Sequence, residues 1–178
     1  MSGNTTLKNI LDLDYVIKNT KNLPLKVELR KTSLKGIGIY AIKFIKKEEI
    51  IALYQVKVFR EKKYESPTLN SYMIGVYSPS GYESKVWVGD IVPESLQPPV
   101  LHEDGKHYVP YWGYFSNEPS GNQKENSYMD MNIDEIYKNK KRLKEGDLIF
   151  YKLIATQNIK PGEEIVWCYG EEYGERDY

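Results

Sequence analysis

The sequence predicts a mostly β protein with one folded domain. Short segments of alternating apolar and polar residues, or of clustered Ile, Val and Tyr, recur along the 178 residues and are typical of strands. Turns rich in Gly, Pro or charged residues separate these segments, and only one stretch half-fits a helix. Many short strands with few helices favour a mostly β fold. A chain of this length can bury a sizeable core.

Residues 1–24 form a polar leader followed by the segment LKNILDLDYVIKN. Apolar residues at positions 7, 10, 11 and 17 half-fit a short amphipathic helix, and Pro24 ends the segment. We therefore expect residues 1–24 to be an N-terminal extension with helical character, and the domain proper to span residues 25–178.

The first half of that domain is expected to be rich in strands. LKVELRK (25–31) alternates apolar and polar residues, as a half-buried strand does, and KGIGIYAIKFI (35–45) follows it. After a charged turn comes the strong strand IIALYQVKVF (50–59). Two further strands, SYMIGVYS (71–78) and SKVWVGD (84–90), flank the turn PSGY.

The second half alternates between loops and strands. Residues 93–110 hold four of the nine prolines and both histidines, which predicts a loop. Residues 111–133 are irregular and then strand-like, and KNKKRLKEGD (138–147) is a charged connector. LIFYKLIATQNI (148–159) is a long strand or a strand pair, and EEIVWCYG (163–170) is the last strand.

Charge and cysteine content exclude several classes of protein. The 25 basic and 25 acidic residues cancel, so direct nucleic-acid binding is not expected. The single cysteine, Cys168, cannot form an internal disulfide or a cysteine-based zinc site. No signal peptide or bilayer-spanning apolar run is visible, so we expect an intracellular protein without a membrane partner. Strand propensity can account for the sixteen tyrosines.

Three short motifs could carry chemistry, and each has a structural alternative. KGIGIY (Lys35–Tyr40) places two glycines two residues apart, which suits a turn or bulge or the close approach of a ligand. HEDGKH (His102–His107) holds potential metal ligands, but their spacing fits no helix face, and we expect no metal site. KNKKRLK (138–144) fits a solvated hairpin tip better than a phosphate contact.

Three segments, taken together and in order, resemble blocks of the SET-domain family of protein lysine methyltransferases, most closely its PR-type branch. SLKGIGIYAIKFIKKEEIIALYQ is similar to the first block, in which a GxG turn precedes a run that ends near a tyrosine. YFSNEPSGNQKEN occupies the place of the family's RFINHSCxPN block, and ATQNIKPGEEIVWCYGEEY is similar to the last block. The resemblance runs from Leu25 to the C-terminus. It implies several small curved sheets, few short helices and a knot-like threading of the C-terminal segment.

This resemblance implies a chromatin regulator that transfers methyl groups from S-adenosylmethionine to a lysine side chain. The favoured substrate is a basic protein such as a histone tail, and the location is then the nucleus. Tyr169 falls on the family's catalytic tyrosine, Tyr54 on a tyrosine of the lysine channel and Tyr151 near a third, and Trp167 would also line the channel. The implied cofactor contacts are the backbone groups of Lys35, Gly36, Ile37, Gly38 and Ile39, together with Tyr72, Asn117 and the backbone of Glu118. The Asn117 amide carries both the donor and the acceptor that the edge of a purine needs.

The residue types suit such a reaction. Aromatic walls pack against the alkyl stem of a lysine and offer cation–π contact to its methylated product. Burial and a nearby sulfonium charge both lower the pKa of the substrate amine. Oxygen atoms around the methyl group can orient it through weak C–H···O contacts, and catalysis is then mostly alignment. No metal is required.

The sequence departs from the family pattern in ways that leave alternatives open. Glu118 stands where His is usual, Tyr114 where Arg is usual and Val56 where Gly is frequent. The tail 170–178 takes the place of the zinc-binding segment that many members carry. A PR-like module that binds peptides without turnover therefore stays open, as does a methyltransferase for a non-histone protein. The sequence does not specify the target lysine or the oligomeric state.

The C-terminal stretch 161–178 holds six carboxylates against one arginine. Adjacent Glu163 and Glu164 are expected on opposite sides of a strand, so they do not form the facing pair of a glycosidase. Beside the lysine channel, the six carboxylates would attract a basic peptide, with an attraction that weakens with salt. A solvated terminus is the alternative.

Overall fold

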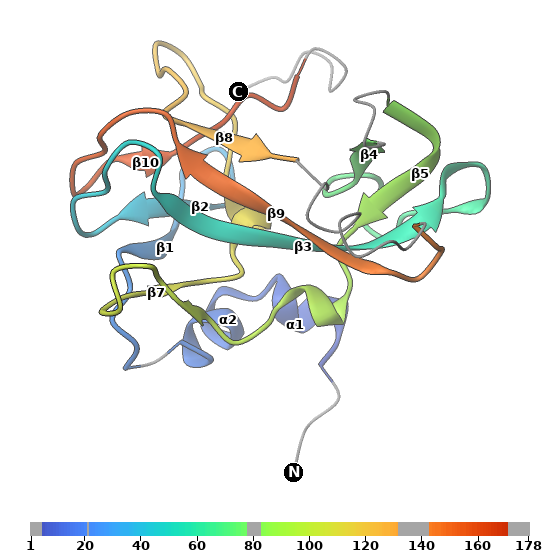
Figure 1. Cartoon of the computed structure of the whole chain (residues 1–178), viewed down its shortest axis with the longest axis horizontal. Coiled ribbons are helices and arrows are strands. Elements are labelled where there is room, and N and C mark those ends of the chain that lie inside the picture. The colour runs from blue at the N-terminus through green and yellow to red at the C-terminus, as the bar shows by residue number, and fades with distance from the viewer. Residues whose placement is uncertain (1–4, 21, 78–82, 132–142, 171–178) are drawn as a thin grey trace.

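The computed structural model describes residues 5–20, 22–77, 83–131 and 143–170. Most of its regular structure is strand (Figure 1). The strands are β1 (Val27–Lys31), β2 (Ile37–Ala41), β3 (Ile50–Arg60), β4 (Ile74–Tyr77), β5 (Glu83–Asp90), β6 (Val100–Leu101), β7 (Tyr108–Val109), β8 (Ser127–Asp130), β9 (Leu148–Ala155) and β10 (Glu164–Ile165).

Antiparallel pairing assembles these strands into small sheets. One has the order β4-β5-β3-β9-β8, a second β1-β2-β10, and a third pairs β6 with β7. In Figure 1, β3 and β9 cross the middle of the molecule, and the helices lie beneath them. The prediction of a mostly β fold of small sheets is confirmed, whereas the knot-like threading of the C-terminal segment stays a prediction.

The long strand β3 is central because most side chains along it are buried. Its middle residues, Ile51 to Val56, are all at most 9% exposed, as expected for a strand covered on both faces. On its partner β9, Ile149, Tyr151 and Leu153 are buried, while the alternating Leu148 and Phe150 face outward. The segment 148–159, expected to be a long strand or a strand pair, is therefore one strand that ends at Ala155.

The N-terminal segment folds into two short helices, α1 (Leu7–Ile10) and α2 (Leu13–Lys18). The break lies at Asp12, whose side chain accepts a hydrogen bond from the backbone N–H of Tyr15 (2.8 Å) and so begins a new helix. Ile10 and Val16 are fully buried, so both helices pack on the core. The boundary between an extension and a domain at residue 24 stays a prediction.

Two expectations about local structure are corrected. Residues 93–110 are not loop alone, because they contain β6, β7 and the 3-10 turn η2 (Pro93–Ser95). The last strand is shorter than expected, since only β10 pairs with β2. At Val166 the chain instead bridges to Asn117, so the following residues leave the sheet. The 3-10 turns η1 (Glu61–Lys63) and η3 (Gly113–Phe115) complete the regular structure.

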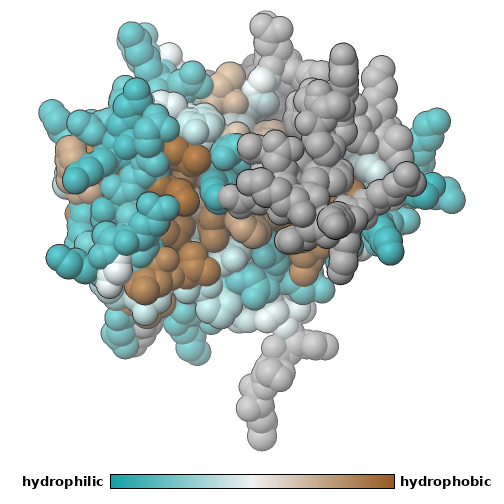
Figure 2. Space-filling view, viewed as in Figure 1, coloured by the Kyte–Doolittle hydropathy of each residue, from teal (hydrophilic) through white to brown (hydrophobic). Residues whose placement is uncertain are grey.

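The outer side of the five-stranded sheet keeps some apolar side chains in solvent. Tyr128 of β8 and Leu148 and Phe150 of β9 are 40–46% exposed. In the view of Figure 2, hydrophobic side chains gather in a band left of the centre of the molecule, with hydrophilic ones further to the left. Within the described residues, neither helix has the length or apolar character needed to cross a bilayer.

The alternation along β9 makes a matched pair of truncations. Leu153 is fully buried and Leu148 is 46% exposed on the same strand. We expect Leu153→Ala to lower the free energy of unfolding by about 2–5 kcal/mol, because it leaves a cavity in the core. Leu148→Ala should change it by less than about 0.5 kcal/mol. Urea denaturation of both variants measures the difference, and equal losses would contradict the assigned register.

Candidate active site

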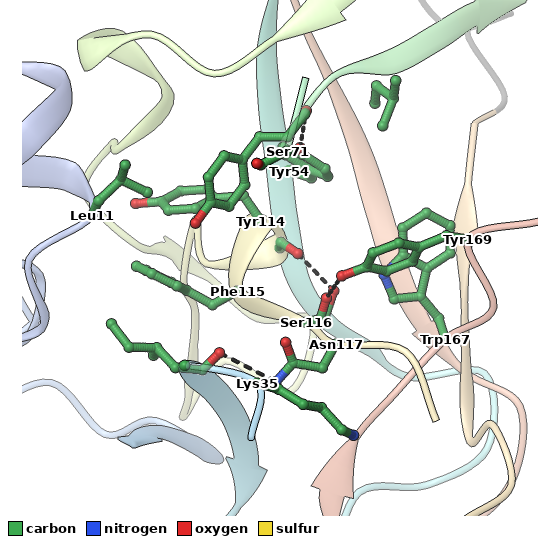
Figure 3. Close-up of a pocket in the computed structure, with 15 residues that line it drawn as sticks. Leu11, Lys35, Tyr54, Ser71, Tyr114, Phe115, Ser116, Asn117, Trp167 and Tyr169 are labelled. Atoms are coloured by element: carbon green, nitrogen blue, oxygen red, sulfur yellow. Dashed lines mark hydrogen bonds between the residues drawn. The ribbon is translucent and has the colours of Figure 1, made fainter. Parts of the chain in front are cut away.

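A cavity of about 330 Å³ opens between segments that are far apart in the sequence. In Figure 3, Leu11 lies at one end, Trp167 and Tyr169 lie at the other, and Lys35 lies below. The lining residues are Leu11, Lys35, Gly36, Ile37, Tyr54, Ser71, Tyr72, Ile74, Gly113, Tyr114, Phe115, Ser116, Asn117, Trp167 and Tyr169.

Phenolic groups form much of this wall, and hydrogen bonds hold two of their hydroxyl groups, those of Tyr54 and Tyr169, to backbone carbonyls. The Tyr54 hydroxyl donates to the carbonyl of Tyr72 (2.5 Å), and the Tyr169 hydroxyl donates to the carbonyl of Ser116. The rings of Trp167 and Tyr169 pack with centroids 4.7 Å apart. Because hydrogen bonds and ring packing fix both tyrosines, their oxygens have defined positions in the cavity.

Burial keeps two further phenols neutral. It raises the pKa of Tyr72, and it raises the pKa of Tyr114 strongly, with a smaller contribution from the neighbouring Tyr72. Neither phenol therefore ionises near neutral pH. Both contribute to the cavity as uncharged rings with polar hydroxyl groups.

A largely buried carboxylate, that of Glu164, holds the base of the site together. Its Oε1 accepts from the Asn117 amide (3.0 Å), and its Oε2 accepts from Gln123 (3.3 Å) and lies 3.4 Å from the Lys35 ammonium. Only 12% of the Glu164 side chain and 6% of the Lys35 side chain are exposed. The ammonium also donates to the carbonyl of Glu118 (2.7 Å). Removing either partner of this ion pair would leave the other charge buried without compensation.

The GxG segment fits against this network because Gly38 has no side chain. A Cβ on Gly38 would lie 2.9 Å from Asn117 Nδ2 and 2.9 Å from Glu164 Oε1, too close for either contact. Gly36 has a φ of +76°, which favours glycine, and no atom lies within 4 Å of where its Cβ would be. The turn therefore presents open backbone at Gly36 and close packing at Gly38.

The network limits what Asn117 can offer a ligand. Its Nδ2 donates both to the carbonyl of Ile37 (3.2 Å) and to Glu164, so both amide protons are used inside the protein. The sequence predicted a donor and an acceptor for a purine edge. In this arrangement the side chain can present only Oδ1, an acceptor.

Most of the predicted site residues meet in the cavity. Lys35, Gly36, Ile37, Tyr54, Tyr72, Asn117, Trp167 and Tyr169 all line it. Gly38, Ile39, Glu118 and Tyr151 do not: Gly38 packs on the network, Ile39 is fully buried, and Tyr151 is the cross-strand partner of Tyr54. Direct contact with a ligand stays a prediction for all twelve residues.

The departures from the family pattern do not obstruct the cavity. The Glu118 carboxylate accepts a hydrogen bond from the backbone N–H of Tyr169 (3.2 Å). Val56 is fully buried in the core, where its side chain would lie 2.6 Å from a Cβ added at Gly89. Tyr114, which replaces an arginine of the family, lines the cavity with its ring.

Sequence reasoning missed several lining residues. Tyr114, Phe115 and Ser116 could have been found, because they directly precede the predicted Asn117. Gly113 allows η3 to approach β3, since a Cβ there would lie 2.6 Å from the Cβ of Tyr54. No sequence signal identifies Leu11, which reaches the site only through the packing of the N-terminal helices.

Sequence reasoning also missed the hydrogen bonds that hold the loop carrying Ser71 and Tyr72. Asp90, fully buried at the end of β5, accepts hydrogen bonds from Tyr64 (2.9 Å) and Ser66 (2.6 Å). Burial and this bond raise the pKa of Tyr64, so it stays a donor. These two hydrogen bonds fix the start of the loop, and Ser71 and Tyr72 further along it line the cavity.

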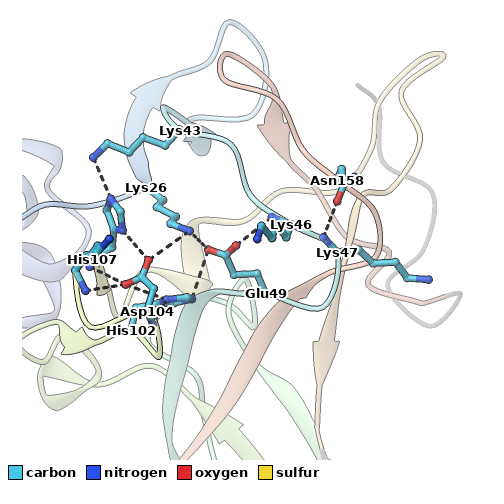
Figure 4. Close-up of polar contacts among 10 residues, drawn as sticks. Lys26, Lys43, Lys46, Lys47, Glu49, His102, Asp104, His107 and Asn158 are labelled. Carbon is cyan, nitrogen blue, oxygen red and sulfur yellow. Dashed lines mark hydrogen bonds and ion pairs between the residues drawn. The ribbon is translucent and has the colours of Figure 1, made fainter.

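The histidines of the HEDGKH motif serve a structural network away from this cavity (Figure 4). The His107 ring lies 2.7 Å from the Asp104 carboxylate and 3.0 Å from the Lys43 ammonium, while His102 lies 3.4 Å from Glu49. These contacts hold His107 between a carboxylate and an ammonium, so its ring is fixed within the network. No group of His, Cys, Asp and Glu side chains in the described parts of the chain is arranged to hold a metal.

The position of Glu164 corrects the prediction that all six carboxylates of residues 161–178 attract a basic peptide. Glu163 is exposed and Glu164 faces inward onto Lys35, so the two do point to opposite sides. Glu164 is therefore not part of a carboxylate surface for a basic peptide. The other acidic residues of the stretch, at 171, 172, 175 and 177, lie outside the described residues, as does most of the basic run 138–144.

Comparison with known protein families identifies most of the chain. A family model of the SET domain matches residues 36–170. No curated protein sequence gives a significant match.

Solved structures with a similar fold share little sequence with this chain. The methyltransferase domain of human PR domain-containing protein 2 is 20% identical with a TM-score of 0.48, and the match covers 99% of this chain and 95% of that one. A candidate histone methyltransferase from Plasmodium falciparum is 18% identical with a TM-score of 0.45, covering 82% and 97%. KRYPTONITE, in complex with mCHH DNA, an H3(1-15) peptide and SAH, is 15% identical with a TM-score of 0.47, covering 85% and 25%.

The buried carboxylate gives a prediction with a matched control on the adjacent residue. We expect Glu164→Ala to lower the free energy of unfolding by about 3 kcal/mol, because it leaves the Lys35 ammonium buried without its charge partner. Glu163→Ala removes an exposed carboxylate and should have little effect. Thermal or urea denaturation compares the two, and similar stabilities would show that Glu164 does not hold the site together.

Proposed function

The chain belongs to the SET-domain family, and we propose that it is a protein lysine methyltransferase that uses S-adenosylmethionine. The main observation in support of this proposal is that residues of all three family segments line the same cavity. A basic protein is the expected substrate, with a histone tail favoured, and the expected location is then the nucleus.

The cavity fits a cofactor of this kind. Its volume of about 330 Å³ lies at the lower end of the range of about 300–1,000 Å³ usual for small-molecule sites. Gly36 and Ile37 would hold the cofactor with backbone groups, Asn117 with its amide oxygen and Tyr72 with its ring. When bound, the cofactor supplies a methyl group on a sulfonium. The protein side chains therefore need only bind and align.

The tyrosines suit the other half of the reaction. A hydroxyl group that donates its only hydrogen to a backbone carbonyl can offer other groups only the lone pairs of its oxygen, so it acts toward them as an acceptor. Tyr54 and Tyr169 are held in this way, so their oxygens can accept from a substrate amine or orient a methyl group. Aromatic surroundings disfavour the charged ammonium form of the substrate and so lower its pKa. Alignment and desolvation together supply the catalysis.

The non-catalytic peptide-binding module is the rival reading. Its support was the set of departures at Glu118 and Val56, and neither residue obstructs the cavity. The proposal is tested by incubating the protein with labelled S-adenosylmethionine and core histones, and then with a lysate of non-histone proteins. Label on a lysine supports the enzyme, and the labelled fraction identifies its substrate class. Cofactor binding by calorimetry without transfer to any protein would favour the rival.

Tyr169 is the residue on which turnover should depend most. Tyr169→Phe keeps the ring and removes the hydroxyl that donates to Ser116. We expect kcat to fall at least about tenfold, equivalent to about 1.4 kcal/mol, with little change in cofactor affinity, because the lost group acts in the aligned transition state.

Tyr128→Phe is the matched control, since Tyr128 is 41% exposed on β8 and does not line the cavity. Its kcat should equal that of the wild type. Near-normal turnover of Tyr169→Phe would show that another residue occupies the catalytic position.

Trp167 gives an expectation about the number of methyl groups. Its indole packs on Tyr169 at the cavity wall and carries no hydroxyl that could anchor the amine after one transfer. We therefore expect dimethylation or trimethylation, although the bulk of an indole works against it. Mass spectrometry of the product over time decides the matter. A product that stays monomethylated with excess cofactor would show that bulk prevails.

A further inference from the structure

The N-terminal segment forms one wall of the cavity. Leu11, between α1 and α2, is among the lining residues, and Figure 3 shows it at the end opposite Trp167 and Tyr169. This segment precedes residue 36, where the match to the SET-domain family begins. Leu11 therefore lies outside the part of the chain that the family model matches.

Tyr114 joins this segment to the aromatic residues of the site. Its hydroxyl donates to the backbone carbonyl of Ile10 (2.8 Å), and only 4% of the residue is exposed. Its ring packs edge-on against Tyr72 at 6.2 Å and tilted against Tyr54 at 6.2 Å. One buried phenol thus contacts both the N-terminal segment and two tyrosines of the cavity wall.

The segment depends on docking for its structure. Its helices span 4 and 6 residues, far below the length of about 12–15 residues at which isolated helices become even marginally stable. Ile10 and Val16 are fully buried, so packing on the core supplies what helix propensity cannot. Any ligand that contacts Leu11 binds the docked state in preference to the undocked one.

We propose that residues 5–20 are part of the cofactor site, and that binding of the cofactor and docking of this segment stabilise each other through Leu11 and Tyr114. The inference rests on the proposed function, because it takes the ligand to be S-adenosylmethionine or its product. Coupling of this kind is reciprocal, so a ligand that needs the segment also holds it in place.

Hydrogen exchange of the full chain, with and without saturating S-adenosylhomocysteine, tests the coupling. The backbone N–H groups of Asp12 and Val16 are hydrogen-bonded within the segment and report its opening. We expect exchange across residues 9–19 to slow at least about threefold on binding. Residues 100–109, which do not line the cavity, should be unchanged.

Two pairs of variants assign the coupling to named residues. Tyr114→Phe removes the bond to Ile10, and its control Tyr15→Phe removes an exposed bond of the same segment to Thr5 (3.0 Å). Leu11→Ala removes the wall contact, and its control Leu13→Ala truncates a partly buried leucine that does not line the cavity. We expect Tyr114→Phe and Leu11→Ala to weaken S-adenosylhomocysteine binding about threefold to tenfold by calorimetry, and each to do so more than its control.

The outcomes separate this inference from the function on which it rests. Ligand binding that leaves exchange across residues 9–19 unchanged, or that is equally strong in Leu11→Ala and Leu13→Ala, would overturn the inference alone. Absence of any S-adenosylhomocysteine binding to the wild-type chain would overturn the proposed function and the inference with it.

Discussion

The carboxylate of Glu164 is the constraint on which the site depends. It binds the Asn117 amide, the Gln123 amide and the Lys35 ammonium, and so connects the last strand, the middle loop and the GxG turn. Because the pair with Lys35 is largely buried, removing one partner leaves an uncompensated charge. This explains why the turn needs Gly38, whose missing Cβ leaves room for the amide and the carboxylate. Three segments distant in sequence can then border one cavity.

The tyrosine content gains a physical explanation from the same geometry. Strand propensity accounts for many of the sixteen, but those at the cavity are fixed by hydrogen bonds to backbone carbonyls or by packing between rings. A wall of oriented phenols presents apolar ring surface and still offers oxygen atoms as acceptors. Such a wall suits the alkyl stem and amine of a lysine.

The sequence predicts strands well where the apolar pattern alone determines which side chains are buried. It predicts site residues only where they lie in a segment that resembles the family. β3 and β9 follow directly from their apolar patterns. The pattern could not show that the last strand ends at Ile165, because the bridge from Val166 to Asn117 is a tertiary contact. Lys35 was predicted through its backbone, yet its side chain forms the buried ion pair. Leu11 carries no local signal, since only the docking of a separate segment brings it to the cavity.

The central claim is that this one cavity binds the cofactor, and a titration observed by NMR tests it directly. The three tryptophans give three indole N–H resonances, of which only that of Trp167 belongs to a residue lining the cavity. Trp87 lies away from it, with its ring under the Arg60 guanidinium. On addition of S-adenosylhomocysteine, the account predicts saturable shifts of the Trp167 indole and of the Gly36 amide, with the Trp87 indole unchanged. Saturable binding that leaves Trp167 and Gly36 unshifted would contradict it.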